Sequence, residues 1–376
     1  MAMFVRKAWS KERASQHFDA YFSRLLKNSR HQTSLQVWME SSGFTYRYAA
    51  GRISANKDAA VSLNQPFHTA SIGKVFTAVI IMKLVERGQL ALEDPICKYV
   101  TPTELTHLFV YRGVDYASQV TIHQLLGHTS GVADYFEDPV LHKPSFIQRI
   151  IANPDEVWTP DALLDFTRNN QVNHGPPESR YYYSDTGYIL LGRMIERITG
   201  RSFSENLHLD IFSPLQMNDS YLMFFPQSQQ ESAEPIQDIW LNTVEISRFP
   251  SLSCDWAGGG IVTTPQDLLI FQKALHHGTC ISQTSLQAMM TFKHKFRSGI
   301  HYGLGMMELH FEEFFFLLRG LPRLQGHSGI LGTHMFSHPE SETHIVMNFG
   351  STKSIVRSYK ALIEVMITLK RMQIWA

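Results

Sequence analysis

The stretch Ser71-Ile72-Gly73-Lys74 leads without interruption into a long apolar run that stops at Gly88. Because this run contains no proline or glycine before Gly88, it predicts a buried helix that ends at that glycine. Residues three apart share one face of a helix, so the amine of Lys74 can reach the hydroxyl of Ser71. The N-terminus of a helix also offers free N–H groups and a positive dipole end, which favour an oxyanion. The stretch therefore predicts a serine nucleophile with a lysine base.

A second tetrad, Ser54-Ala55-Asn56-Lys57, has the same spacing. A chain of this length is expected to contain on the order of one or two such tetrads by chance. Ser54 lies in a polar, loop-like stretch, and no apolar helix follows it. We therefore interpret the Ser71 tetrad as functional and the Ser54 tetrad as coincidental.

The composition is typical of a globular protein rather than a disordered one, with 376 residues, 44% of them hydrophobic and 18% charged. The formal net charge of +0 gives no indication of a nucleic-acid partner or of an anionic membrane surface. No window approaches 18 uninterrupted apolar residues, and residues 1–9 lack the apolar run of a signal peptide. We expect a soluble, cytoplasmic protein without a membrane partner.

The cysteine and histidine patterns predict neither a metal site nor a cofactor. The three cysteines, Cys97, Cys254 and Cys280, are far apart and form no CxxC pair. A disulfide framework or a cysteine-based zinc site is therefore not expected. The 18 histidines include no HExxH or comparable ligand spacing, which argues against a metal enzyme.

The periodicity along the chain predicts an α/β (α+β) fold. A helix is expected near 10–28 and a hairpin from strands at 35–39 and 44–48, while residues 95–295 look mostly helical. Strand-like runs return at 303–310, 313–319, 329–336 and 343–349, and a helix at about 354–371 closes the chain. We predict a sheet domain built from residues 1–95 and 296–376 and a helical domain from 96–295. The active site is expected in the cleft between them.

Two further motifs are candidates for chemistry, and each has a structural alternative. In Tyr183-Ser184-Asp185, the tyrosine can act as a base or relay a proton if positive neighbours lower its pKa. Alternatively, the aromatic residues 181–183 pack a domain interface. The motif His327-Ser328-Gly329 precedes a strand-like run, and a histidine in such a position is more often structural than catalytic.

The motifs and their order along the chain resemble those of the serine beta-lactamase-related superfamily. That superfamily includes class C beta-lactamases, D-alanyl-D-alanine carboxypeptidases, D-aminopeptidases and beta-lactamase-like esterases. The matching stretches are 67–74, 84–95, 120–131, 183–188, 256–261 and 326–329. The resemblance covers about 35 to 350 and implies an antiparallel sheet flanked by helices, with an inserted helical domain.

The resemblance also implies roles for individual residues. Ser71 would be the acylated nucleophile, Lys74 the base, and Tyr183 the group that passes a proton to the leaving group and then to water. The oxyanion would be bound by the backbone N–H groups of Ser71 and Ile330. Burial and the positive helix end both favour the neutral amine that the base role needs. The residues implied in substrate binding are Asp185, His327, Gly329 and Ile330.

Two departures from the family pattern bear on the substrate. Asp185 stands where the family most often has asparagine or serine, and an ionised aspartate accepts hydrogen bonds but donates none. His327 stands where many beta-lactamases have lysine, and histidine is less surely charged at neutral pH. Both changes disfavour acylamino and carboxylate recognition and favour a small ester, or a substrate with a free amine that Asp185 could bind.

The sequence therefore predicts a serine hydrolase acting on a small ester, amide or peptide, with an esterase-like activity as the leading hypothesis. A D-amino-acid peptidase, a DD-carboxypeptidase or a weak beta-lactamase is one alternative. A catalytically weak relative with a scaffolding or regulatory role is another. The sequence gives no prediction of the oligomeric state.

Overall fold

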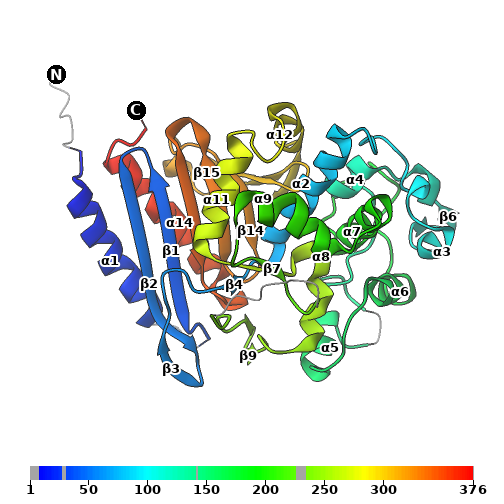
Figure 1. Ribbon diagram of the computed structural model, residues 1–376, viewed down its shortest axis with the longest axis horizontal. Helices are drawn as coiled ribbons and strands as arrows, with labels where there is room; N and C mark the ends of the chain where they lie inside the picture. The colour runs from blue at the N-terminus through cyan, green and yellow to red at the C-terminus, as the bar shows by residue number, and fades with distance from the viewer. Residues whose placement is uncertain (1–7, 28–30, 141–142, 226–233, 376) are drawn as a thin grey trace.

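A nine-stranded sheet forms the centre of the computed structural model, which describes residues 8–27, 31–140, 143–225 and 234–375 (Figure 1). Its strands, in spatial order, are β11 (His294–Arg297), β12 (Ile300–Tyr302), β13 (Met307–Leu309), β14 (Leu324–Gly329), β15 (Thr333–His338), β16 (Thr343–Asn348), β1 (Ser34–Ser41), β2 (Phe44–Ser54) and β3 (Lys57–Ala60). All neighbouring pairs are antiparallel, and β1 pairs with β16 so that Gln36 lies opposite Asn348. The two ends of the chain therefore build one sheet, and the fold class is the one predicted.

Helices cover both faces of this sheet. On one face, α1 (Lys11–Lys27) and α14 (Ile355–Arg371) bury apolar side chains against Val37 and Met39 of β1. On the other face, α11 (Pro265–His276) packs on β1, β15 and β16. Side chains alternate across a strand, so Trp38 lies on this second face, in the core that α11 shares. The helices predicted near 10–28 and 354–371 and the hairpin at 35–48 are confirmed.

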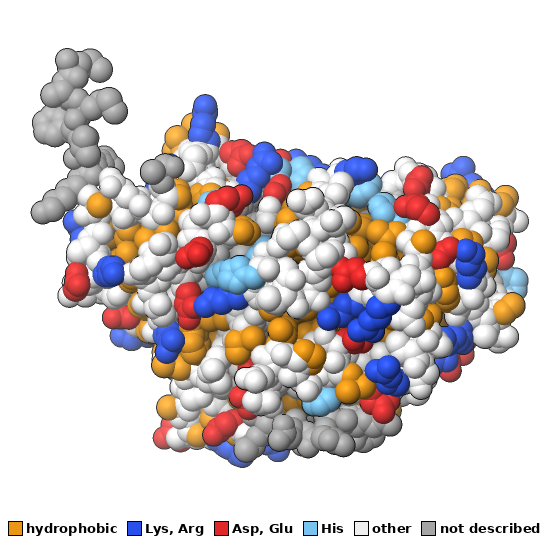
Figure 2. All heavy atoms as spheres, turned by 45° about the horizontal axis from the view of Figure 1, so that its top comes forward, with side chains coloured by type: hydrophobic (Ala, Val, Ile, Leu, Met, Phe, Trp, Pro, Cys, Tyr) orange, Lys and Arg blue, Asp and Glu red, His pale blue; other side chains and the backbone are white. Residues whose placement is uncertain are grey.

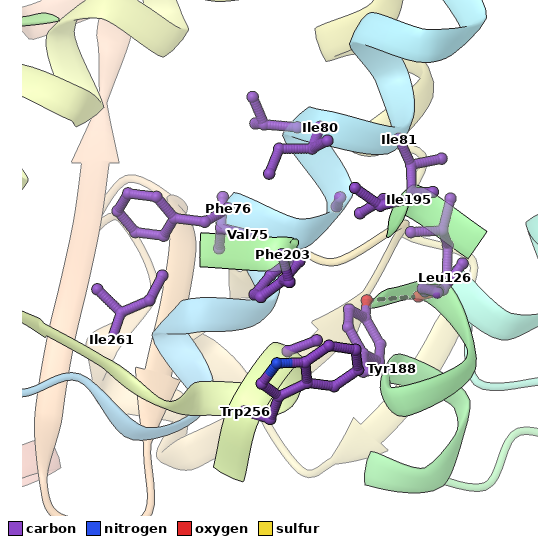
Figure 3. Close-up of a cluster of buried hydrophobic side chains, with 14 of the residues drawn as sticks. Val75, Phe76, Ile80, Ile81, Leu126, Tyr188, Ile195, Phe203, Trp256 and Ile261 are labelled. Atoms are coloured by element: carbon purple, nitrogen blue, oxygen red, sulfur yellow. Dashed lines mark hydrogen bonds between the residues drawn. The ribbon is translucent and has the colours of Figure 1, made fainter. Parts of the chain in front are cut away.

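The middle of the chain is mostly helical and packs around the central helix α2 (Gly73–Glu86). Its main helices are α3 (Pro102–Leu105), α4 (Ile122–Leu126), α5 (Phe146–Ala152), α6 (Pro160–Asn170), α7 (Asp185–Thr199), α8 (Phe203–Leu207), α9 (Ser213–Leu215), α10 (Trp256–Gly259) and α12 (Gln283–Met289). Figure 3 shows side chains of α2, α7 and α8 in one buried cluster with Trp256, and the hydrogen bond that Tyr188 donates to the carbonyl of Leu126. Helix α2 is buried on nearly every side, as its uniformly apolar sequence predicts, and Gly88 follows it with φ +66°.

Short strands complete the middle segment. One three-stranded sheet consists of β4 (Phe67–His68), β10 (Ile261–Thr263) and β7 (Tyr221–Leu222). Two small hairpins are formed by β5 (Val110–Tyr111) with β6 (Val114–Asp115), and by β8 (Trp240–Leu241) with β9 (Val244–Glu245). The β4–β10 pair holds the chain directly before Ser71, so this small sheet positions the predicted nucleophile.

The predicted strands after residue 300 need three corrections. Residues 313–319 form the end of α13 (Phe311–Phe314) and the 3₁₀ turn Phe316–Leu318, not a strand. Glu312 and Glu313 favour a helical first turn, and Phe315 and Phe316 are exposed instead of packed in a sheet. The run 329–336 is two strands, because Gly332 adopts φ +71° and turns the chain. Only the second half of 303–310 is strand.

The surface carries charges of both signs. Figure 2 shows Lys and Arg side chains intermingled with Asp and Glu on one face, in keeping with the formal net charge of +0. Among the helices that the structure describes, none is long and apolar enough to cross a membrane.

Candidate active site

Ser71 and Lys74 meet at the start of α2. Ser71 lies in a 3₁₀ turn, Ala70–Ile72, that runs directly into the helix, and Lys74 lies in the first helical turn. The Nζ atom of Lys74 is 3.3 Å from the Oγ atom of Ser71, and the lysine side chain is completely buried. The local spacing of the tetrad thus places a hydroxyl and an amine within hydrogen-bond distance.

The backbone around Ser71 is held in an unusual conformation. Ala70 has φ +50°, a left-handed conformation that is strained for a residue with a side chain. Its N–H donates to the Nδ1 atom of His68 at 3.1 Å, which fixes the turn. On the other side, a Cβ atom on Gly73 would lie 2.9 Å from the Cα atom of Gly259. The close approach of these two backbones therefore requires glycine in the tetrad.

Lys74 has two partners besides Ser71. Its ammonium group donates to the carbonyl oxygen of Gly258 at 2.8 Å and forms an ion pair with Asp185. A Cβ atom on Gly258 would lie 3.0 Å from the Asp185 Oδ1 atom, so glycine leaves room for this pair. No sequence pattern indicated a role for Gly258, although its place in the glycine run 258–260 was the available signal.

Tyr183 lies two residues before α7 (Asp185–Thr199) and forms a side-chain hydrogen bond with Ser71. The Lys74 Nζ atom is 5.0 Å from the centroid of its ring. Burial and the charge of Asp185 raise the pKa of Tyr183 well above its usual value, although a side-chain hydrogen bond with Ser71 opposes this shift. The lowered pKa that a base role requires is therefore not found, because burial and the charge of Asp185 both oppose the phenolate. Tyr183 is a neutral phenol that can donate a proton.

The packing alternative for the aromatic run 181–183 also has support. The Tyr183 ring lies 4.2 Å from the ring of His128 and 5.3 Å from that of Phe296, measured between centroids. Tyr183 therefore both packs between segments and reaches the site, and the two readings do not exclude each other.

The motif on β14 differs from the expectation at His327. Its imidazole has no exposed surface and is 3.1 Å from the hydroxyl of Tyr302. Burial and the charge of Lys74 lower the pKa of His327 to about 3, so the ring is neutral. Because neighbouring side chains on a strand point to opposite faces, Ser328 lines the pocket instead and is hydrogen-bonded to Tyr359 at 2.6 Å. His327 lies on the opposite face of β14 and packs against Tyr302.

Gly329 and Ile330 lie next to the serine turn. A Cβ atom on Gly329 would lie 2.7 Å from the carbonyl oxygen of Thr69 and 2.8 Å from the Ala70 Cβ atom. The hydroxyl of Thr333 donates to the same Thr69 oxygen at 2.9 Å and ties the β14–β15 turn to this segment. Ser71 and Ile330 both line the pocket, which is the placement that the predicted oxyanion-binding pair requires.

A pocket of about 300 Å³ opens over Ser71. Its lining consists of Ala70, Ser71, Phe136, Glu137, Tyr183, Asp185, Asp255, Gly258, Gly259, Phe296, Arg297, Ile300, Met307, Ser328, Gly329, Ile330, Thr352, Ile355 and Tyr359. These residues come from the serine turn, the loop at 136–137, the chain leading into α7, the region of α10, and the sheet with the start of α14. The division into a sheet domain and a helical domain stays a prediction.

The charged groups of the pocket are mostly acidic. Glu137, Asp185 and Asp255 line it, against one arginine, Arg297. Burial and the charge of Asp185 raise the pKa of Asp255 to about 7. Sequence analysis did not identify Asp255 or Glu137, because they lie far from the tetrad in the chain and belong to no motif.

A further carboxyl group holds the start of α7. Asp134 is buried, and its side chain accepts hydrogen bonds from the backbone N–H groups of Asp185 at 2.9 Å and Glu137 at 3.0 Å. Burial and the charge of Asp185 raise the pKa of Asp134 well above its usual value. Asp134 therefore positions two acidic residues of the pocket from behind.

The combination of this fold with a Ser–Lys pair at a helix start and a neighbouring tyrosine is typical of serine hydrolases that carry an SxxK motif. The family model described as Beta-lactamase matches residues 18–363, and the chain belongs to this family of serine hydrolases.

Curated relatives include two bacterial proteins. Penicillin-binding protein 4* of Bacillus subtilis (strain 168) is 26% identical over 78% of this chain and 63% of its own length. Penicillin-binding protein 4 of Amycolatopsis lactamdurans is 29% identical over 54% of this chain and 47% of its own length. The chain thus spans less than two thirds of these relatives.

Among solved structures, the D-amino acid amidase of Ochrobactrum anthropi SV3 has a TM-score of 0.75 at 22% identity, and the alignment covers 96% of this chain and 99% of the amidase. At this identity the likeness establishes the fold alone.

Proposed function

We propose that this protein is a serine hydrolase that forms an acyl-enzyme on Ser71 and acts on small esters and amides whose acyl part carries a free ammonium group. The observation that carries the proposal is the Ser71–Lys74 pair at the base of a pocket that Glu137, Asp185 and Asp255 line. A pocket rich in carboxyl groups favours a cationic substrate over a substrate carboxylate.

The substrate ammonium would do more than bind to the acidic pocket. By competing for Asp185, it would also break the ion pair between Lys74 and Asp185. A charged lysine cannot take the proton of Ser71, so the base must first become neutral. A substrate ammonium that binds Asp185 places a second positive charge near Lys74, which favours the neutral amine. Substrate binding would thereby release the base from the carboxylate.

The reaction then follows from the placement of the three groups. The Ser71 oxygen attacks the substrate carbonyl while Lys74 takes the hydroxyl proton, and the N–H groups of Ser71 and Ile330 bind the oxyanion. Tyr183 donates its proton to the leaving amine or alcohol as the bond to the carbonyl breaks and takes a proton from Lys74 in return. Water then attacks the acyl-enzyme, gives its proton to Lys74, and releases the acid and Ser71. The peptidase, carboxypeptidase and scaffold alternatives differ in the substrate or in whether turnover occurs at all.

A panel of substrates tests this proposal on the purified protein. It compares D-phenylalaninamide with its N-acetyl form, short-chain nitrophenyl esters, a chromogenic cephalosporin and a D-alanyl-D-alanine peptide. We expect the fastest hydrolysis for the free-amine amide, slower hydrolysis for the nitrophenyl esters, which lack the ammonium but have an activated leaving group, and little for the N-acetyl amide. A clear preference for the cephalosporin or the peptide would contradict the proposed substrate class, and no turnover of any substrate would favour the scaffold alternative.

Removing one carboxylate at a time locates the ammonium site. In Asp185→Asn we expect the ratio of free-amine to N-acetyl turnover to fall by about tenfold or more, the scale of one charged hydrogen bond. Glu137→Gln is the comparison variant, because Glu137 lines the same pocket but forms no ion pair with Lys74 among the described residues, and the ratio should fall less there. Using a ratio cancels any general loss caused by disturbing Lys74. An unchanged ratio in Asp185→Asn would show that this residue does not select the amine.

Tyr183→Phe tests proton transfer to the leaving group. This change keeps the ring that packs on His128 and removes only the hydroxyl. We expect kcat to fall by roughly 10²-fold or more, the scale of general acid–base catalysis, with unchanged thermal stability. The loss should be larger for amides than for nitrophenyl esters, since nitrophenolate leaves without a proton. Near-normal amide turnover would leave Tyr183 with a packing role alone.

A further inference from the structure

Two imidazoles and two carboxylates meet on the hairpin of β12 and β13, on the face turned away from the pocket. Ile300 and Met307 of this hairpin line the pocket. Side chains alternate along a strand, so their neighbours His301 and Glu308, which lie opposite each other across the two strands, point to the other face. His310 follows β13 directly, and Glu313 lies in α13.

Three donor atoms converge within this cluster. The Oε1 atom of Glu313 is 2.8 Å from the Nε2 atom of His301 and 3.5 Å from the Nδ1 atom of His310. The two imidazole rings are stacked, with centroids 4.0 Å apart and planes at 19°. All three ligand atoms lie within 4.8 Å of one another, the range in which one ion can contact them together. The side chains are 10–26% exposed, so solvent reaches the cluster.

Two neighbouring residues, Glu308 and Lys295, contact the candidate ligands and orient them. The Nε2 atom of His310 is 2.6 Å from the Oε2 atom of Glu308, and the Nδ1 atom faces Glu313. Lys295 binds the other oxygen of Glu313, Oε2, at 2.7 Å, so that Oε1 is the oxygen turned to the two imidazoles. A carboxylate behind a ligating histidine is the common arrangement at zinc sites.

The Nδ1 atom of His310 and the Oε1 atom of Glu313 face each other at 3.5 Å, and both are atom types that ligate metal ions. A metal ion satisfies His301, His310 and Glu313 at once. Two imidazole nitrogens and one carboxylate oxygen are a ligand set that Zn²⁺ prefers.

We propose that His301, His310 and Glu313 form a binding site for a divalent transition-metal ion of the Zn²⁺ class, with Glu308 and Lys295 orienting the ligands. The site ties the β12–β13 hairpin to α13 and has a structural role. It lies outside the pocket, so the proposal does not depend on the proposed function. The expectation of no metal site rested on sequence spacing alone, and these ligands come together only through the pairing of two strands.

Metal binding by the full chain tests this proposal without any activity assay. After treatment with a chelator, the protein is dialysed against Zn²⁺ and its bound metal is quantified, and thermal unfolding is followed with Zn²⁺ or with Mg²⁺. We expect one equivalent of bound Zn²⁺ and a rise in Tm with Zn²⁺ but not with Mg²⁺, which prefers six oxygen ligands. Co²⁺ should give the visible absorption of a site with nitrogen ligands. Binding of less than one equivalent, with no change in Tm, would overturn the proposal.

Variants separate this site from adventitious binding. His310→Gln should lower Zn²⁺ affinity by more than about 100-fold, and Glu308→Gln, which removes an orienting contact, by about 10- to 100-fold. His208→Gln is the matched control, because His208 is exposed and lies outside the cluster. Equal affinity in His310→Gln and the control would overturn the assignment. Should His310→Gln fail to fold, the Glu308→Gln variant and the Co²⁺ spectrum of the wild type still decide the question.

Discussion

Ser71→Ala is expected to abolish covalent labelling by a serine-directed phosphonate and to lower turnover on the order of 10⁶-fold, the loss seen when a nucleophilic serine is removed from a catalytic unit. The wild-type protein should take up one label per chain, at Ser71. The reason is geometric, because the Ser71 hydroxyl lies 3.3 Å from the buried amine of Lys74 and lines the pocket. Mass spectrometry of the labelled and digested protein identifies the modified residue.

The second tetrad supplies a control for this prediction. Ser54 and Lys57 lie opposite each other across the β2–β3 turn and not on a helix, and Lys57 is exposed. The N–H of Ala55 donates to the Oδ2 atom of Asp238 at 2.7 Å, so this turn has a structural role. Ser54→Ala should label and turn over like the wild type. Labelling that persists in Ser71→Ala, or that is lost in Ser54→Ala, would contradict the assignment of the nucleophile.

The contrast between the two tetrads shows what sequence can predict about this site. The Ser71–Lys74 contact depends on local geometry within one helical turn, and the apolar run behind it indicated that the turn is helical and buried. The contacts of Lys74 with its other two partners do not depend on local geometry. Asp185 is 111 residues away and Gly258 is 184 residues away, so only the packing of α2, α7 and α10 brings them together. Asp185 was found through a motif, and Gly258 was missed.

The strand motif shows a second limit. His327-Ser328-Gly329 was recognised as a unit, but which side chain faces the pocket depends on strand register, and a shift of one residue exchanges the two faces. The register of β14 against β15 turns Ser328 to the pocket and His327 to Tyr302. The error at 313–319 has a similar origin, since a run rich in phenylalanine suits a strand only where a neighbouring strand can pair with it.

Lys74→Met is expected to lower turnover by roughly 10⁴-fold or more, because the base and the nucleophile act as one unit. It should also destabilise the protein, since breaking a buried ion pair leaves a carboxylate without its partner, at a cost of about 3–5 kcal/mol. Lys74 is completely buried, and Asp185 has Asp134 and Asp255 as acidic neighbours. Methionine keeps the length and the apolar stem of lysine while it removes the charge. Urea unfolding measures the change in the free energy of unfolding.

The loss of unfolding free energy in Lys74→Met should depend on pH. Burial and Asp185 raise the pKa of Asp255 to about 7 in the folded state, above its unfolded value of about 4. Between these values the folded state binds more protons than the unfolded state, so the free energy of unfolding falls as pH rises. Lys74 opposes this shift, and its removal raises the folded pKa further. The destabilisation of Lys74→Met should therefore be larger at pH 8 than at pH 5.

A double variant separates the two roles of Lys74. Lys74→Met combined with Asp185→Asn removes the unpaired carboxylate together with its partner, so most of the lost stability should return, and the difference between pH 8 and pH 5 should shrink. Turnover should remain as low as in Lys74→Met, because no base has been restored. If the double variant regained turnover, Lys74 would not be the base. If it regained no stability, the stability loss in Lys74→Met would not come from the broken ion pair with Asp185.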